Sequence, residues 1–372
     1  MKNILLFLTV LLLVGAMVLW FRHGGGAPYP NLSTTPVLPS TSLEEVLTYP
    51  EPVGNVAVNR EGRLFFTIHP ESRPTGNKLL EYVRGAAVPY PSGAAQSELF
   101  DTVLGVVIDR FNRLWTIDHG NHGLRTARIV AIDLDTNTVL RDQKLSPDIA
   151  PAGSFLQDLQ VSADGNTIVI ADASFWRKSP AIIVYDVETG NARRVLESHE
   201  SVAAEDYLIR NGDRKMEFLG GIVALRGGID GIALGKEWLY YGAISGSGLF
   251  RVRLRDLRDE ALPAAQLARR VERVSDKPLS DGMSIDVEGN VYITDIENRS
   301  IFIAGTGREP QTLIESNALR LPDALSFGPD GYLYIADSAL AELILQSREH
   351  IEAQGPYRIF RFRPGFEGVP GQ

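Results

Sequence analysis

The chain has 372 residues, of which 44% are hydrophobic and 22% charged, with no cysteine and a formal net charge of -9. The lack of cysteine excludes disulfides, thiolate metal sites, a cysteine nucleophile and a lipidated N-terminal cysteine. The acidic balance, without a basic stripe, argues against nucleic acid as a partner. Sequence patterns for serine hydrolases, phosphate-binding loops and zinc proteases are also missing.

Residues 1–22 predict a signal anchor or a signal peptide. An uninterrupted apolar run from Ile4 to Phe21 follows Lys2 and Asn3. Its length of about 18 residues is near the minimum that spans a bilayer. We expect an uncleaved anchor, with cleavage near Ala27 as the alternative. Residues 23–42, rich in Gly, Pro, Ser and Thr, predict a flexible tether. The remainder is therefore expected in the periplasm or outside the cell, either membrane-anchored or secreted.

A hairpin unit recurs through residues 43–366. Its clearest copy, Leu279–Glu297, has an apolar strand, a Glu-Gly-Asn turn and a second strand of alternating β-branched and aromatic residues. Five further copies begin at Asn55, Val106, Asp158, Asp230 and Asp323. A strand-rich repeat of roughly 40 to 70 residues predicts stacked blades. Six copies predict an all-β fold, a six-bladed β-propeller, whose radial closure removes most exposed sheet edges.

Several other segments carry more specific expectations. Leu43–Tyr49 is expected as an amphipathic lead-in to the first blade, and Ala181–Asp186 as a strand within the long gap between the third and fourth copies. Apolar residues at helical spacing predict a helix over Ala339–Glu352. Tyr357–Phe362 is expected to supply a strand that closes the ring, and residues 367–372 a C-terminal tail. Helix should otherwise be scarce.

Acidic side chains recur at one position of the repeat, the leading end of the first strand. In a propeller this strand lines the central channel, so these side chains should converge on one channel mouth. Like charges in a concave site raise each other's pKa, and a divalent cation would relieve them. Oxygen ligands suit Ca²⁺ or Mg²⁺, and Asp230 and Asp281 are the favoured metal ligands. Alternatively, each aspartate is a turn residue that caps its own strand. The members are Asn55, Asp158, Asp230, Asp281 and Asp323.

A second acidic position ends the neighbouring strand of the same hairpin, with the members Asp118, Asp172, Asp295 and Asp337. These residues should lie at the same mouth but further from the axis, either in direct contact with a ligand or accepting hydrogen bonds from loops. His119 and His122 are the only closely paired histidines and are candidates for a general base or proton shuttle; the alternative is two exposed loop histidines. Phe155, Phe175 and Trp176 are candidates for an aromatic wall, whereas Tyr241 is expected between blades.

An ordered series of motifs resembles the yellow and major royal jelly protein family. The series comprises Arg113–Gly120, the strand-and-turn segments ending at Asn137 and Gly190, and Asp230-Gly-Ile-Ala-Leu followed by Leu239-Tyr-Tyr-Gly-Ala-Ile-Ser-Gly. The resemblance implies a six-bladed propeller, mostly in secreted proteins, of which some convert dopachrome and others bind small amines.

A more distant resemblance is to the gluconolactonase and senescence-marker propellers. Asp281-Gly-Met-Ser-Ile-Asp286 with Gly289-Asn-Val-Tyr is similar to one motif of that group. The resemblance implies a metal held at the channel mouth by acidic and amide residues. The sequence departs from it at Asn55, which replaces a metal-binding glutamate, and the Gly-Pro expected after that position is absent.

Two functions remain open from the sequence. The first is a monomeric propeller that binds a small organic ligand, aromatic or amine, at the channel mouth. The second is a divalent-metal-dependent lactone hydrolase or dopachrome-type isomerase, in which the cation polarises an oxygen. The first is favoured, because neither a nucleophile nor a secure base is evident. The membrane is expected to be contacted only through the N-terminal segment.

Overall fold

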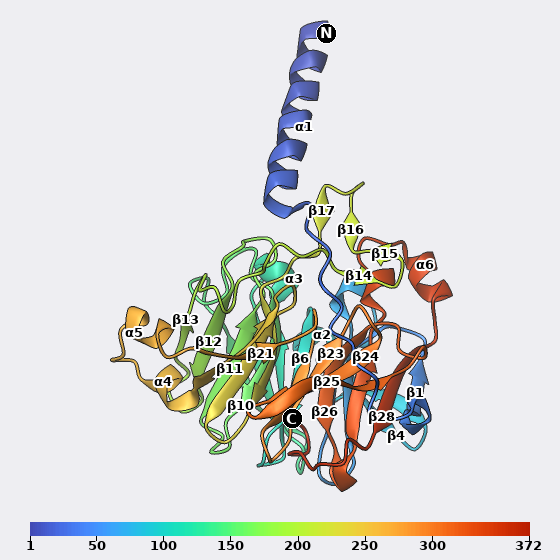
Figure 1. Ribbon diagram of the computed structural model, residues 1–372, viewed down its shortest axis with the longest axis vertical. Helices are drawn as coiled ribbons and strands as arrows, with labels where there is room; N and C mark the ends of the chain where they lie inside the picture. Colours follow the sequence, from blue (N-terminus) through green and yellow to red (C-terminus); the bar gives the residue numbers. More distant parts are fainter.

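The computed structural model describes residues 1–372 and has six four-stranded antiparallel sheets arranged around one axis (Figure 1). The predicted six-bladed β-propeller with an N-terminal apolar helix is confirmed. In each of the first five blades the strands follow in sequence from the channel outward. The first three blades are β2 (Val53–Val58), β3 (Leu64–Ile68), β4 (Leu79–Val83) and β5 (Ala86–Pro89); β6 (Val103–Ile108), β7 (Arg113–Asp118), β8 (Arg128–Asp133) and β9 (Thr138–Lys144); β10 (Leu156–Val161), β11 (Thr167–Asp172), β12 (Ala181–Asp186) and β13 (Ala192–Val195).

The remaining blades follow the same plan, except that the last is completed by the first strand of the chain. They are β18 (Ile229–Leu234), β19 (Trp238–Ala243), β20 (Gly248–Arg253) and β21 (Glu272–Asp276); β22 (Met283–Ile285), β23 (Asn290–Asp295), β24 (Ser300–Gly305) and β25 (Arg308–Glu315); β26 (Pro322–Phe327), β27 (Leu333–Asp337), β28 (Tyr357–Phe362) and β1 (Glu44–Tyr49).

Ring closure differs from the expectation. Tyr357–Phe362 forms β28, the third strand of the last blade, and the closing strand is β1, which was expected to be a lead-in. The two strands pair antiparallel from Glu44 opposite Arg361 to Tyr49 opposite Tyr357. The pairing covers an outer edge that β28 alone would leave open and ties the two ends of the ring together.

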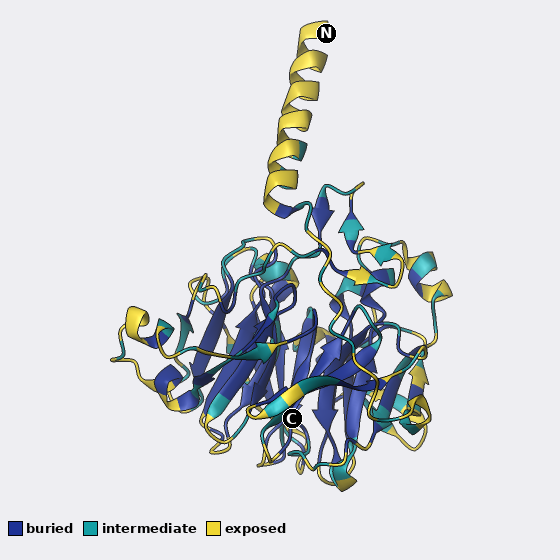
Figure 2. Ribbon diagram, in the orientation of Figure 1, coloured by how far each residue is buried: buried dark blue, intermediate teal, exposed yellow.

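The core lies between the blades. Strands β2, β6, β18 and β26 are buried along their whole length, and Figure 2 shows the sheets dark except at their outer strands and turns. Each sheet is covered on both faces by its neighbours. The inner strands are therefore mostly apolar along their length and do not alternate between apolar and polar residues. Large aromatic residues such as Trp115, Tyr185 and Tyr292 are fully buried in this packing.

Helix is scarce, as expected. The helices are α1 (Lys2–His23), α2 (Ala95–Glu98), α3 (Gly120–Gly123), α4 (Leu254–Arg258), α5 (Ala264–Ala268) and α6 (Arg348–Ala353), with single turns η1 (Ser40–Ser42), η2 (Pro70–Ser72), η3 (Pro329–Gly331) and η4 (Leu340–Glu342).

The helix predicted over Ala339–Glu352 is wrong in extent. Only the turn η4 and the short helix α6 form there. Ala339 and Leu345 have φ values of 52° and 57°, in the left-handed region that no right-handed helix can contain. Ser347 then starts α6 as its N-cap, accepting a hydrogen bond from the backbone of His350.

The long insertion between the third and fourth blades forms two small ribbons at the end of the propeller from which α1 rises (Figure 1). The ribbons are β14 (Arg210–Asn211) with β15 (Arg214–Lys215), and β16 (Glu217–Phe218) with β17 (Val223–Ala224).

The flexible tether was predicted over residues 23–42, but His23 is the last residue of α1, and residues 24–42 lie against the propeller. Ala27 exchanges backbone hydrogen bonds of 2.8 Å with Asp206 and Leu208, and Leu38 donates to the carbonyl of Leu313 at 2.8 Å. The segment is therefore hydrogen-bonded to the body of the protein at both of its ends.

The C-terminal tail crosses the channel at the end where the inner strands finish. Gly368 forms a bridge with Asp286, and the carbonyl of Gly371 accepts from the backbone of Ile108 at 2.8 Å. The buried side chain of Gln372 donates to the carbonyl of Val161 at 3.1 Å. The opposite end, where the inner strands begin, is hereafter the mouth.

Candidate functional site

The predicted inner-strand residues lie at the mouth but on two successive positions of the repeat. In blades one and three, Asn55 and Asp158 directly precede the residues that pair with the second strand. In blades four and five, Asp230 and Asp281 stand one residue earlier, whereas in blade six Asp323 again directly precedes a paired residue, Ala324. Inner strands such as β2, β10, β18 and β26 carry a register shift there, which leaves neighbouring residues unpaired and free to point toward the channel.

Glycine beside two of these aspartates sets how closely the blades approach. A Cβ atom at Gly231 would clash with the carbonyl oxygen of Asp281, and one at Gly282 would clash with that of Asp323. The missing side chains of Gly231 and Gly282 therefore let β18 and the segment before β22 lie directly against the aspartate of the next blade. Asp158, Asp230, Asp281 and Asp323 are hereafter the acidic ring.

The acidic ring is held in its protonated form more readily than ordinary carboxylates. Burial raises the pKa of Asp158 to about 7, and burial together with the charge of Asp158 raises that of Asp281 to about 7. For Asp230 and Asp323 burial is again the main cause, followed by repulsion from Asp281, and the pKa of each is well above its usual value. The Oδ2 atoms of Asp230 and Asp323 are buried without a hydrogen-bond partner.

A buried lysine next to the ring was missed by the sequence analysis. The side chain of Lys277 is fully buried, and its ammonium group donates to the carbonyl of Pro278 (3.0 Å) and the hydroxyl of Ser280 (2.9 Å). Burial lowers the pKa of Lys277 to about 7, although Asp230 and other nearby carboxylates oppose this. Lys277 stands between β21 and β22, outside the repeated hairpin, so the repeat gave no signal for it.

The second acidic position has a different role. Asp118 accepts hydrogen bonds from the backbones of Asp101, Thr102 and Gly120 at 2.6 to 3.0 Å. Asp337 accepts from the backbones of Arg320 and Leu321, and Asp295 from Glu297 and Asn298. Asp118 and Asp337 thus hold the segments that lead into β6 and β26, and Asp295 holds the turn between β23 and β24.

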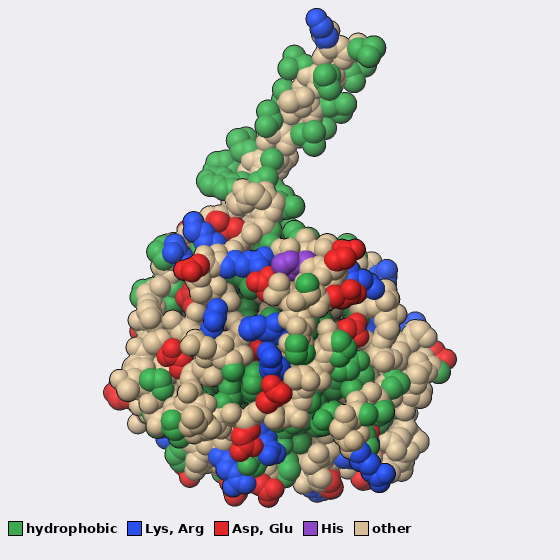
Figure 3. All heavy atoms as spheres, turned by 90° about the vertical axis from the view of Figure 1, so that its right-hand side faces the viewer, with side chains coloured by type: hydrophobic (Ala, Val, Ile, Leu, Met, Phe, Trp, Pro, Cys, Tyr) green, Lys and Arg blue, Asp and Glu red, His purple; other side chains and the backbone are tan.

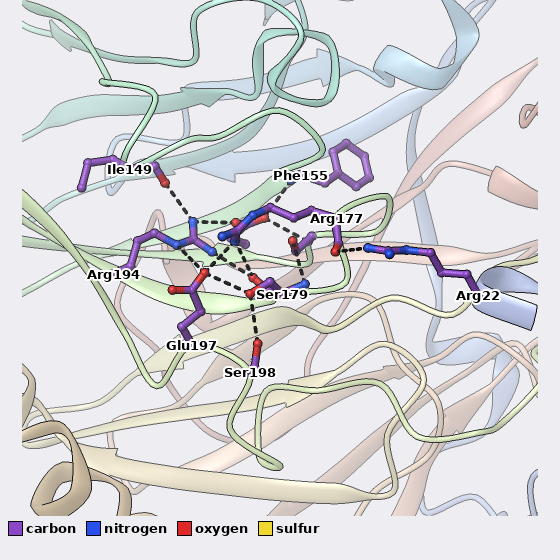
Figure 4. A network of polar contacts seen from close by, with 10 residues as sticks. Arg22, Ile149, Phe155, Arg177, Ser179, Arg194, Glu197 and Ser198 are labelled. Carbon is purple, nitrogen blue, oxygen red and sulfur yellow. Dashed lines mark hydrogen bonds and ion pairs between the residues drawn. The ribbon is translucent and has the colours of Figure 1, made fainter. Parts of the chain in front are cut away.

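Asp172 extends this pattern into an ion-pair network, whose members Arg194, Glu197 and Arg177 are labelled in Figure 4. It accepts from the backbone of Phe155 at 2.8 Å and pairs with Arg194 at 2.7 Å, with both side chains almost fully buried. Arg194 also contacts Glu197, which pairs with Arg177 at 2.6 Å. The carbonyl of Arg177 accepts from Arg22 of α1 at 2.7 Å. The network thus joins α1 to the start of β10, the inner strand of the third blade.

Two histidines occupy equivalent places in the first two blades, directly after the residues that pair with the start of β2 and β6. His69 and His119 are buried, and each Nδ1 accepts a backbone hydrogen bond, from Glu71 and from His122 respectively. Burial lowers the pKa of His69 to about 4 and that of His119 well below its usual value, so both rings are neutral at pH 7. His69 Nε2 lies 3.6 Å from Asp323 Oδ2, which is longer than a hydrogen bond.

His122 is not a free loop residue. Its Nε2 contacts Glu71 Oε1 at 2.9 Å, and its ring packs against Phe155 at 4.3 Å between centroids. Burial raises the pKa of Glu71, but the hydrogen bond with His122 and the neighbouring histidines together lower it to about 2. Glu71 and His69 were not predicted as site residues; the equivalence of His69 with His119 in the repeat was the available signal.

Four of these groups, His69, Glu71, His122 and Asp281, line a cavity of about 210 Å³ at the mouth, hereafter the mouth cavity. Its walls are mostly apolar, and its polar atoms come from residues of several blades. The predicted aromatic wall of Phe155, Phe175 and Trp176 lines it, whereas Tyr241 is buried between blades with its hydroxyl on Ser201. The polar lining residues are His69, Glu71, His122, Gln157 and Asp281.

The ring partly fits a divalent cation. It offers several carboxylates, two of them with an unpartnered buried oxygen, which suits a hard cation. However, no three His, Asp or Glu side chains stand together in an arrangement that could hold a metal ion. The positions predicted as metal ligands, Asp230 and Asp281, therefore supply the right chemistry without a formed coordination shell.

A family model described as major royal jelly protein matches residues 101–322, from the entrance of the second blade to the start of the last. The match covers more than half of the chain. The chain belongs to the major royal jelly protein family. A comparison with curated protein sequences gives no match.

Solved structures similar to this family member share its fold at low sequence identity. A luciferin-regenerating enzyme aligns with a TM-score of 0.58 and 11% identity, covering 88% of this chain and 97% of its own. A gluconolactonase from Xanthomonas campestris has a TM-score of 0.52 and 13% identity, with coverages of 92% and 98%. The calcium-binding protein regucalcin from Agrobacterium tumefaciens has a TM-score of 0.54 and 14% identity, with coverages of 91% and 98%. Such identities establish the fold alone.

Proposed function

We propose that this protein is an exported, monomeric binding propeller that holds a small aromatic or amine-bearing molecule in the mouth cavity. The observation that carries the proposal is the combination of a mostly apolar cavity with a carboxylate of the acidic ring, Asp281, in its lining. Pockets of this composition bind the body of a ligand by burial and orient it with a few polar groups.

A cationic amine suits this cavity for an electrostatic reason. Asp281 repels the carboxylates of Asp230 and Asp323, so a positive charge beside Asp281 in the cavity relieves that repulsion. Aromatic walls add contact with a planar ligand body and attraction for a cation. The net charge of -9 likewise favours cationic ligands over nucleic acid.

Export is supported by α1, an apolar helix whose residues are exposed to solvent except at its C-terminal end. An exposed apolar helix of this length is stable in a bilayer rather than in water. We propose that α1 remains as an anchor and that the propeller faces the periplasm or the exterior; secretion after cleavage is the alternative.

A second candidate is a divalent-metal-dependent lactone hydrolase or dopachrome-type isomerase. It is favoured by the unpartnered Oδ2 atoms of Asp230 and Asp323, which a Ca²⁺ or Mg²⁺ ion would satisfy. A bound cation would supply Lewis-acid activation of a substrate oxygen. The chain's own groups near it, neutral His69 and buried Lys277, would hold or move protons.

Calorimetric titration of the full chain in detergent micelles separates these functions. We expect phenethylamine to bind and the variant Asp281→Asn to weaken it by at least about tenfold, while its neutral analogue 2-phenylethanol binds both proteins alike. The control Asp330→Asn makes the same charge change at the far end of the channel, where Asn tolerates the φ of 61°. Binding of Ca²⁺, Mg²⁺ or Zn²⁺ that is lost in Asp281→Ala, without amine binding, would support the second candidate instead.

A further inference from the structure

The apolar helix α1 stands on the mouth of the propeller with no free linker between them (Figure 1). His23, at its C-terminal end, is buried against the rings of Phe175 and Trp176, with centroid distances of 5.7 and 5.3 Å. Both aromatic residues also line the mouth cavity. Arg22 bonds to the carbonyl of Arg177, and Ala27 already pairs with the insertion. The end of the helix and the rim of the cavity are thus one packed unit.

The rim of the cavity exposes large apolar side chains. Trp176, Leu219 and Leu345 line the cavity and are 41%, 57% and 59% exposed. Leu219 and Leu345 also have positive φ values of 51° and 57°, which cost a leucine energy that glycine would avoid. Leucine side chains are usually buried, and leucine backbones usually avoid positive φ. Two leucines at one rim that depart from both preferences are expected where a surface contacts another apolar surface.

Basic side chains surround the base of the helix. Lys178 lies over the ring of Phe175 at 4.6 Å and donates to the carbonyl of Arg226 at 2.8 Å. Arg22 and Arg226 are close enough to act on its charge, and of the three only Arg226 has an acidic partner, the exposed Asp206. Figure 3 shows the apolar rod of α1 rising from an end of the propeller where charged side chains gather. Cations at this level suit the phosphate groups of phospholipids.

We propose that the mouth of the propeller rests on a phospholipid bilayer and that the mouth cavity takes its ligand, an amphiphilic amine, from that bilayer. The inference rests on the proposed function, because it assumes that the cavity binds a ligand. It adds the orientation of the propeller and the class of ligand, a cationic head with an apolar chain or ring.

The dimensions agree with this arrangement. A helix of 22 residues is about 33 Å long, which matches a hydrocarbon core of about 30 Å. When α1 crosses the bilayer, its C-terminal end lies at the interface, and the rim that packs on His23 lies there too. A lipophilic amine concentrates in this interface, enters past the exposed leucines and brings its cationic head to Asp281 in the cavity lining.

The orientation is testable by site-specific labelling, since the chain has no cysteine of its own. The variants Leu219→Cys and Leu345→Cys are labelled with an environment-sensitive fluorophore, and the full chain is reconstituted in phosphatidylethanolamine–phosphatidylglycerol vesicles with shallow nitroxide lipids. Val287→Cys is the matched control, because Val287 is 56% exposed but lies at the tail end of the channel. We expect at least roughly twofold quenching at both rim positions and none at the control position.

The ligand class is tested in the same vesicles with octylamine and butylamine as probes. Each buried methylene strengthens binding severalfold, so octylamine should bind at least about tenfold more tightly, and Asp281→Asn should weaken both amines. Amine binding without quenching at the rim overturns the membrane-facing orientation and leaves the proposed function standing. Rim quenching without amine binding overturns the proposed function and the ligand class together.

Discussion

The two aspartate positions of each hairpin use the same side chain in opposite ways. The second-strand position is saturated: Asp118 and Asp172 accept several hydrogen bonds, and Asp172 has a buried ion pair. In the acidic ring, by contrast, the Oδ2 atoms of Asp230 and Asp323 are buried without a hydrogen-bond partner. Two carboxylates of the ring thus lack the hydrogen-bond donors that the second-strand position has, and this makes the ring the stronger candidate for a functional site.

The largest expected effect on stability comes from removing a carboxylate at the second-strand position. In Asp172→Ala the guanidinium of Arg194, only 8% exposed, loses its buried partner, and two backbone donors lose their acceptor. Stranding a buried charge costs about 3–5 kcal/mol of unfolding free energy. Denaturant unfolding of the full chain in micelles measures the loss. A loss below about 1 kcal/mol would show that Arg194 finds water or another acceptor.

Removing a charge from the acidic ring should instead stabilise the folded protein. Burial raises the pKa of Asp158 from 3.8 to about 7, so the folded protein binds this proton more tightly than the unfolded chain. Stability therefore falls as pH rises between those values, and the full penalty is present above pH 7. Asp158→Asn keeps an acceptor for the backbone of Leu159 and removes that penalty.

The side chain retains some exposure to the channel, so Asp158→Asn should gain about 1–3 kcal/mol at pH 8, less than the full shift implies. The gain should disappear near pH 4, where the wild-type side chain is protonated. Melting curves at the two pH values give the comparison, and an equal effect at both would exclude ionisation as its cause.

The smallest effect is expected from the reciprocal change in the first blade. Asn55 accepts from the backbone of Val56 at 2.8 Å, as Asp158 does from Leu159, so Asn55→Asp keeps the hydrogen bond and adds a charge to the ring. We expect a loss of about 1 kcal/mol at pH 8 and none near pH 4. In the double variant with Asp158→Asn the two stability effects should not add, because a charge at either position changes the electrostatic potential at the other. Additive effects would separate Asn55 from the ring.

The sequence by itself determined the blades and where the aspartates would gather. The repeated hairpin fixes strand order, and its period carries each leading residue to the same end of the channel, as Asp230 and Asp323 show. Two features could not be predicted from this spacing. Asn55 and Asp281 occupy successive positions of the repeat, and a short turn replaces the long helix expected after Ala339. Both depend on local backbone conformation, which the spacing does not encode.

Only the tertiary structure decided which aspartates are satisfied and what else stands beside them. Lys277 and Glu71 lie outside the repeated pattern and reach the mouth because the blades close into a ring, which also recruits β1 as its last strand. Protonation follows from burial and from charges on other blades, quantities that exist only once distant segments meet. The same holds for α1, whose apolar sequence predicts a membrane helix but whose place at the mouth is set by the packing of His23 on Phe175 and Trp176.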